Sequence, residues 1–224
     1  GYHYFVMEYV EGDTVKDQIS RRGVIPEEEA VDIAVQMTRA LEHAWSHGII
    51  HRDIKPANVM VQEEGQAKLC DLGLAVQVRQ HASITQSGIV MGTPFYLSPE
   101  QARAEKLDIR SDIYSLGATL FHMVTGTPPY DGDSPAVIVS QHLTEEVPDP
   151  QERNPVISRR FADVIRRTMA KEKSARFQTP DDMLEALREI RDRLRTGEMP
   201  SRLGPTRAPR TERRPRVLLG EEGR

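Results

Sequence analysis

One stretch in the first third of the chain holds the side chains best suited to chemistry. Asp53 is a candidate proton acceptor, and Lys55 is a candidate partner for an anion. Asn58 and Asp71 offer the oxygen ligands that Mg²⁺ prefers. Residues 51–58 are too polar for a buried element and too short for a helix. They are predicted to form a loop that presents side chains to a ligand.

A β-hairpin is expected directly after this loop. Residues 59–61 and 67–70 are short apolar runs, and residues 63–66 between them have the composition of a turn. Antiparallel pairing places the start of the first strand beside the end of the second. We therefore expect Asn58 and Asp71 to meet in space and to form a magnesium site.

Three motifs in this region resemble those of the eukaryotic-type (Hanks-type) Ser/Thr protein kinases. HRDIKPAN at residues 51–58 is similar to their catalytic loop. DLG at 71–73 stands where DFG is usual, and SPE at 98–100 stands where APE is usual. The order and spacing of the three are far more specific than any one motif. GTPFYLSPEQA at 92–102 is most similar to the bacterial branch.

The resemblance implies a role for each polar residue of the loop. Asp53 would orient the substrate hydroxyl and accept its proton, and Lys55 would contact the transferring phosphate. Asn58 and Asp71 would hold Mg²⁺. The competing interpretations are a turn aspartate, a solvated lysine and a pair of turn caps. His51 is expected to be a hydrogen-bonded structural residue.

The resemblance also implies an ATP site near the amino-terminal end. Residues 2–10 are rich in β-formers and predict a strand, which would be the last strand of the kinase small lobe and the hinge. The carbonyl of Glu8 and the N–H of Val10 would bond the adenine edge. Met7 would occupy the gatekeeper position, and Met60 would lie under the adenine. A buried edge strand without a ligand is the alternative.

A long polar segment follows the second motif. Residues 75–91 show no periodicity, as in functional or disordered loops. By resemblance this is the activation segment, and Arg52 would capture a phosphate attached to it. Thr93 would contact the catalytic loop rather than receive phosphate. The candidate acceptors are Ser83, Thr85 and Ser87.

Several helices are expected to support the site. In the most apolar one, Ser111 and Gly126 are expected to be the caps, and the resemblance implies that Asp112 anchors the catalytic-loop backbone. Arg176 would either pair with Glu100 or be exposed. Helical spacing of apolar residues predicts helices over 26–46, 111–125, 136–143, 159–170 and 180–195.

Composition fits one large domain. The chain has 224 residues, enough for a sizeable core, and its net charge of -4 indicates neither a nucleic-acid partner nor an anionic membrane. The single cysteine, Cys70, excludes an internal disulfide, fits a reducing compartment and is expected to be a small buried hydrophobe. No apolar run reaches membrane-spanning length. A cytoplasmic location follows, although a parent protein could be membrane-anchored beyond the tail.

The resemblance covers residues 1–195 and implies a mainly α fold, a kinase large lobe with a short β-hairpin at the active site. Residues 1–12 would be the last small-lobe strand and the hinge, and residues 13–195 the large lobe. Residues 196–224, rich in proline and arginine, are predicted to be a disordered tail. Its arginines could touch an acidic partner, but a solvated tether is the preferred interpretation.

The implied activity is transfer of the γ-phosphoryl group of ATP, with Mg²⁺, to Ser/Thr hydroxyls of proteins in signalling. A kinase dimer or trans-autophosphorylation is a further expectation. By family analogy, Lys55 followed by Pro56 favours Ser or Thr over Tyr as the residue that is phosphorylated. The sequence starts at Gly1 and lacks a G-x-G-x-x-G loop, so we expect a fragment that is inactive without the missing small lobe. The alternative is a non-catalytic pseudokinase or scaffold.

Overall fold

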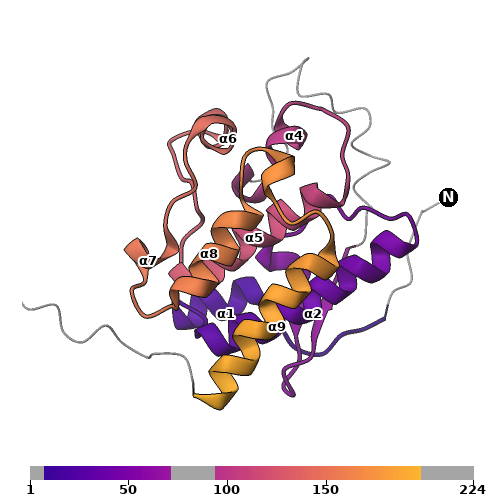
Figure 1. The fold of residues 1–224 in the computed structure, drawn as a ribbon, viewed down its shortest axis with the longest axis vertical. Helices are drawn as coiled ribbons and strands as arrows, with labels where there is room; N and C mark the ends of the chain where they lie inside the picture. Colours follow the sequence, from indigo (N-terminus) through magenta and orange to yellow (C-terminus); the bar gives the residue numbers. More distant parts are fainter. Residues whose placement is uncertain (1–7, 72–93, 198–224) are drawn as a thin grey trace, which may run out of the picture.

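The computed structural model describes residues 8–71 and 94–197, which form a mainly helical body with one small sheet (Figure 1). The longer helices are α1 (Val15–Arg22), α2 (Glu27–Ser46), α5 (Ile109–Thr125), α6 (Pro135–Thr144), α8 (Arg159–Thr168) and α9 (Pro180–Thr196). The shorter ones are α4 (Pro99–Ala102), α7 (Pro150–Arg153) and the 3₁₀ turns η1 (Pro56–Asn58), η2 (Pro94–Tyr96) and η3 (Lys173–Ala175).

The sheet is antiparallel and has the order β1 (Asp13–Thr14), β2 (Val59–Val61), β3 (Ala67–Leu69). The predicted hairpin is confirmed, with Val59 opposite Leu69, although the second strand ends one residue before Cys70. Val59 and Val61 are buried while Met60 is half-buried, because successive side chains point to opposite faces of a strand.

The core lies around α5, which is buried along nearly its whole length. The helix α2 packs against both α5 and α9, and α8 packs against α5 and α9. Burial on all sides explains why α5 is apolar nearly all round. The predicted mainly α fold is confirmed.

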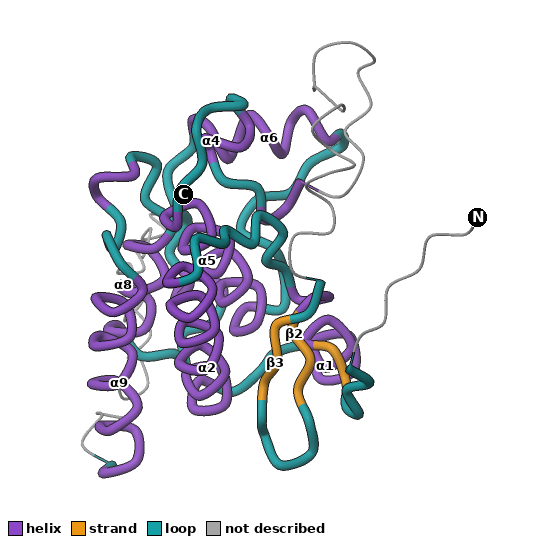
Figure 2. The backbone as a smooth tube through the Cα atoms, turned by 90° about the vertical axis from the view of Figure 1, so that its right-hand side faces the viewer, coloured by secondary structure: helices purple, strands orange, loops and turns teal. Residues whose placement is uncertain are grey.

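The hairpin is attached to α2 by one glutamine side chain. Gln36 donates from Nε2 to the carbonyl of Gly65 at 2.9 Å and accepts from the N–H of Ala67 at 2.8 Å. Figure 2 shows β3 beside α2 and β2 on the side of α1. The hairpin is therefore held between two helices, with the 51–58 loop at its base.

The strand predicted over residues 2–10 can be compared with the structure only at its last three residues, and there it is wrong. Glu8 to Val10 have no regular secondary structure, and the first strand within the described residues is the two-residue β1. The helix α1 was not predicted, since it is short and mostly polar. Its sequence signal is a capping box in which Thr14 and Asp17 satisfy each other's backbone N–H groups.

The expected cap of α5 was also wrong. Asp108, not Ser111, is the N-cap, and its carboxylate accepts from the N–H of Arg110 at 3.0 Å. Ser111 lies inside the helix. The predicted carboxyl-terminal cap, Gly126, is confirmed in the left-handed conformation at φ 75°.

Some expectations fall on residues outside those described. They concern Met7, the strand part at 1–7, Leu72 onward in the activation segment, the acceptors Ser83, Thr85 and Ser87, Thr93, and the tail from residue 198. Within the described ranges, every helix is too short or too polar to cross a bilayer.

Candidate functional site

A single buried carboxylate holds the backbone of the 51–58 loop. Asp112 of α5 is 1% exposed, and it accepts from the N–H of His51 at 2.7 Å and from that of Arg52 at 2.8 Å. Burial raises the pKa of Asp112 to about 6, although these two hydrogen bonds favour the ionised form. The anchoring role expected of Asp112 is confirmed.

The loop backbone is strained at Arg52, the residue before Asp53. Arg52 has φ 68°, in the left-handed region that costs a non-glycine residue about 1–2 kcal/mol. Its N–H is held by Asp112, and its carbonyl accepts from Nε2 of Gln101 at 2.8 Å. The N–H of the strained residue is therefore fixed by α5, and its carbonyl by Gln101.

Three of the predicted site residues contact one another. Lys55 Nζ lies 2.7 Å from Oδ2 of Asp53. The amide nitrogen of Asn58 donates to the Asp53 carbonyl at 2.8 Å and to its Oδ2 at 3.2 Å. Since the NH₂ of Asn58 is turned toward Asp53, its Oδ1 is the atom left to bind a cation.

The fourth residue, Asp71, is brought to the loop by the hairpin. The N–H of Cys70 donates to the carbonyl of Asn58 at 2.8 Å, so Asp71 follows directly after the residue that pairs with Asn58. Asp71 is exposed and has φ 61°, which turns the chain immediately after the strand. This backbone pairing supports the expected proximity of Asn58 and Asp71.

His51 joins the loop to the hairpin, as a structural histidine would. Its Nδ1 accepts from the N–H of Asp53 at 3.3 Å, so its Nε2 carries the proton and donates to the Cys70 carbonyl at 3.0 Å. Burial lowers the pKa of His51, which favours this neutral tautomer. Cys70 itself is half-buried, so the expectation of a buried hydrophobe was wrong.

A metal at this site would need oxygens beyond the protein's own carboxylates. In residues 8–71 and 94–197, no three His, Cys, Asp or Glu side chains gather closely enough to hold an ion. The Oδ1 of Asn58 and the carboxylate of Asp71 are hard ligands that suit Mg²⁺, which usually keeps water or phosphate oxygens in its shell. The residues present therefore fit a magnesium ion bound together with a phosphate.

A cavity of about 580 Å³ opens beside Asp53 and Lys55. One wall comes from η2, where the hydroxyl of Tyr96 lies 2.7 Å from Nδ1 of His122. Burial raises the pKa of Tyr96 and lowers that of His122, so both are neutral and the tyrosine donates. A hydroxyl-bearing substrate in this cavity would reach Asp53 directly.

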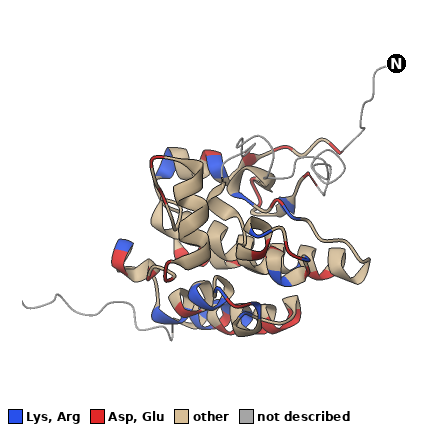
Figure 3. Ribbon diagram, turned by 90° about the horizontal axis from the view of Figure 1, so that it is seen from above, with Lys and Arg blue, Asp and Glu red and all other residues tan. Residues whose placement is uncertain are grey.

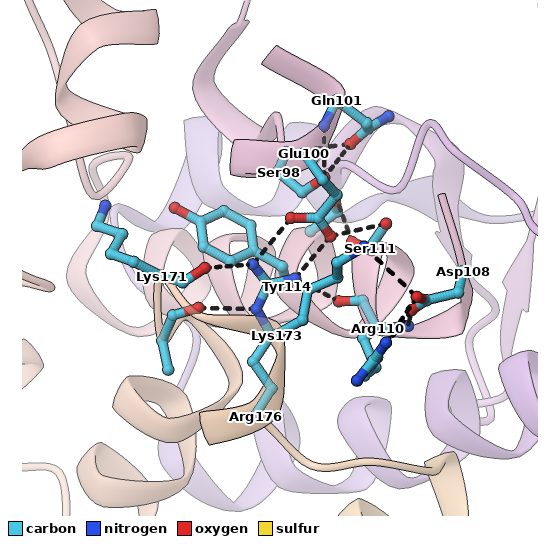
Figure 4. A network of polar contacts seen from close by, with 12 residues as sticks. Ser98, Glu100, Gln101, Asp108, Arg110, Ser111, Tyr114, Lys171, Lys173 and Arg176 are labelled. Carbon is cyan, nitrogen blue, oxygen red and sulfur yellow. Dashed lines mark hydrogen bonds and ion pairs between the residues drawn. The ribbon is translucent and has the colours of Figure 1, made fainter. Parts of the chain in front are cut away.

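A buried ion pair joins α4 to Arg176, the residue that follows η3 (Figure 4). Arg176 contacts Glu100 through two parallel bonds of 2.7 and 2.9 Å, with side chains 0% and 2% exposed. Ser111 donates to Glu100 at 2.7 Å, and three backbone carbonyls accept from Arg176. Despite burial, Arg176 holds the pKa of Glu100 below its usual value. Of the two interpretations of Arg176, pairing with Glu100 is confirmed.

This ion pair is connected to the 51–58 loop through the next residue. Glu100 and Gln101 both lie in α4, which begins with a capping box between Ser98 and Gln101. The same Gln101 donates to the Arg52 carbonyl. Its role was not predicted, although the S-x-x-Q spacing of the capping box was visible in the sequence.

The residues expected to bind adenine are only partly described. Glu8 is exposed, and its carboxylate lies 2.6 Å from Nζ of Lys68 on β3. Val10 and Met60 are half-buried, and Met60 lies in β2. Their contact with a nucleotide stays a prediction.

Comparison with known proteins gives one consistent family. A protein kinase domain model matches residues 1–187. The chain is 42% identical over 189 residues to a probable serine/threonine-protein kinase of Clostridium perfringens, covering 84% of this chain and 27% of that protein. It is 38% identical over 230 residues to serine/threonine-protein kinase PknB of Mycobacterium leprae, covering 97% of this chain and 37% of that protein.

A solved structure has the same fold. Rad53 in complex with AMP-PNP superposes with a TM-score of 0.67 at 24% identity, over 80% of this chain and 45% of that one. The chain thus spans well under half the length of the curated relatives it matches.

Removing the arginine of the buried ion pair should strongly destabilise the fold. Arg176→Met leaves Glu100 charged and without its partner in the core, which should cost about 3–5 kcal/mol in urea unfolding. The control is Arg160→Met, which removes an exposed pair with Glu189 at a similar distance of 2.8 Å and should cost about 1 kcal/mol or less. Equal losses in the two variants would contradict this account of the pair.

The raised pKa of Asp112 predicts a specific pH dependence of stability. The folded protein binds the proton of Asp112 more tightly than the unfolded chain does. The stabilisation that comes from binding this proton is therefore full below pH 4 and is lost as pH rises through about 6. The unfolding free energy of the wild type minus that of Asp112→Asn should fall by roughly 3 kcal/mol across this window. The control is Asp181→Asn at an exposed position of α9. A difference that stays flat or rises with pH would rule out the raised value.

Proposed function

The chain belongs to the protein kinase family, and we propose that residues 51–58 and Asp71 form the phosphotransfer centre of a Ser/Thr protein kinase. The observation that carries the proposal is the joint contact of Lys55 and Asn58 with Asp53, at the base of the hairpin that leads to Asp71. The substrates would be Ser/Thr hydroxyls of proteins, and the phosphate donor would be ATP.

Asp53 is the proposed proton acceptor. Lys55 and Asn58 both contact Oδ2 of Asp53, which leaves Oδ1 to accept a proton from a substrate hydroxyl. The Asp53 side chain is 26% exposed and faces the 580 Å³ cavity. The Lys55 ammonium lies 2.7 Å from this carboxylate, where it can also contact a phosphate.

Asn58 and Asp71 are the proposed ligands of Mg²⁺, with Oδ1 and a carboxylate oxygen respectively. When bound, the ion would neutralise charge on the phosphate oxygens. The contribution of the chain is to fix Asn58 by its two bonds to Asp53 and to set Asp71 at the strand end. The hydrogen bond between Cys70 and Asn58 keeps the two ligands in register.

The adenine end of the nucleotide is assigned to the amino-terminal segment. We propose that the carbonyl of Glu8 and the N–H of Val10 bond the adenine edge, with Met7 beside it and Met60 beneath it. Met60 is half-buried at the exposed face of β2, which supports contact with a flat apolar ring. The 224 residues contain no glycine-rich loop, so they should bind ATP weakly by themselves.

Arg52 is the proposed receiver of an activating phosphate. Its Nε is buried and has no partner among the described residues, as expected for a guanidinium that awaits an anion. The phosphate would come from Ser83, Thr85 or Ser87, transferred by a second copy of the kinase. The same proposal places the domain in the cytoplasm, where the single free Cys70 would stay reduced.

Replacing the proton acceptor should abolish phosphotransfer. With the chain joined at Gly1 to a small lobe that carries a glycine-rich loop and a strand lysine, Asp53→Asn should lower kcat for a generic protein substrate by roughly 10²–10⁴-fold. Asp71→Asn should reduce transfer similarly and raise the Mg²⁺ concentration needed. Radioactive phosphate from ATP reports both effects.

Asp181→Asn, a neutralised acid on α9, is the matched control and should retain full turnover. Unchanged turnover in Asp53→Asn would falsify the assignment of the base. Nucleotide binding without transfer in the otherwise unaltered, joined chain would favour the alternative of a non-catalytic scaffold.

A further inference from the structure

A second concave surface lies away from the proposed phosphotransfer centre. It has a volume of about 1190 Å³ and is bordered by the first half of α2, the β2–β3 turn and the last turns of α9. Gln36 ties the turn to α2, and Arg195 of α9 lies 3.2 Å from Asp32 of α2. The walls of this surface, here called the α2–α9 groove, are therefore linked to one another.

The groove is acidic. Seven carboxylate side chains line it against three arginines. Asp13, Glu29 and Asp32 pair with arginines among the described residues. The other four, Glu11, Glu28, Glu63 and Glu64, are exposed and form no ion pair within the part of the chain that the structure describes. Figure 3 marks the acidic and basic positions along the chain.

Two buried polar atoms in the groove, Oε1 of Gln18 and Nε of Arg191, lack a hydrogen-bond partner among the described residues. Gln18 of α1 lines the groove and is only 9% exposed, and its Oε1 accepts no hydrogen bond from the described residues. An unsatisfied buried acceptor costs about 1–3 kcal/mol, so it points to a missing donor. A donor that carries positive charge would suit both Gln18 and the four unpaired carboxylates.

We propose that the α2–α9 groove binds the arginine-rich segment 202–216 of the same chain. This segment contains six arginines and one glutamate, and guanidinium groups are charged donors. It follows α9, whose Arg191 and Arg195 line the groove. Arg202 is five residues beyond Gly197, so extended chain lets it reach about 17 Å from the helix end.

In this proposal the tail is docked in the α2–α9 groove, whereas composition alone favoured a solvated tether. One guanidinium would donate to Gln18 Oε1, and others would pair with the unpaired glutamates of α2 and the hairpin turn. The binding would be intramolecular, so weak individual ion pairs suffice because the linker keeps the segment at a high local concentration. The inference is independent of the proposed phosphotransfer function.

Trypsin cleavage of the full chain at low ionic strength tests this docking. Cleavage after Arg207 and Arg210, followed by mass spectrometry, should be about tenfold slower than in a synthetic peptide of residues 198–224, equivalent to about 1.4 kcal/mol. Three exposed ion pairs can supply that protection. The variant Glu28→Gln/Glu63→Gln/Glu64→Gln should be cleaved at the peptide's rate, and Gln18→Met should be cleaved several-fold faster than the wild type.

The control removes the same charge elsewhere. Glu152→Gln/Glu172→Gln/Glu185→Gln, all at exposed positions outside the groove, should keep the slow rate. Equal cleavage of the wild type and the peptide, or equal rates in the two triple variants, would overturn the proposal. Protection that grows with protein concentration would assign the groove to the tail of a second copy and would also overturn it.

Discussion

The site depends on the two hydrogen bonds that the Asp112 carboxylate accepts from the backbone of His51 and Arg52. The loop must turn sharply before Asp53, and Arg52 achieves this in a left-handed conformation that costs about 1–2 kcal/mol. Hydrogen bonds to a charged acceptor contribute about 1.5–3 kcal/mol each, so the anchor offsets the strain. A buried acid in the most apolar helix thus positions a loop that contacts solvent.

A second anchor holds the carbonyl of the same strained residue. The Glu100–Arg176 pair fixes α4 in the core, and α4 presents Gln101 to the carbonyl of Arg52. Groups from α5 and α4 therefore hold the N–H and the carbonyl of one peptide segment. With both fixed, Asp53 has a defined place from which to contact Lys55 and Asn58. Preorganisation of this kind limits the reorganisation that a transfer reaction would need.

The parts of the fold that could be predicted from the sequence are those that local patterns encode. Helical spacing located the longer helices, and turn composition located the hairpin that brings Asp71 toward Asn58. The resemblance to kinases anticipated the anchor Asp112. The helix α1 was not predicted because its signal is a capping box rather than an apolar stripe. No local pattern could predict the α2–α9 groove, because its acidic wall joins residues from separate elements. The nucleotide contacts stay predictions.

The most direct measurement is amide hydrogen exchange at His51 and Arg52. If the Asp112 carboxylate holds the loop, both amides should be protected, and Asp112→Ala should speed their exchange at least tenfold relative to amides in α9, in line with about 1.5–3 kcal/mol per bond. Exchange at these two amides that is fast in the wild type, or unchanged by the substitution, would contradict the account.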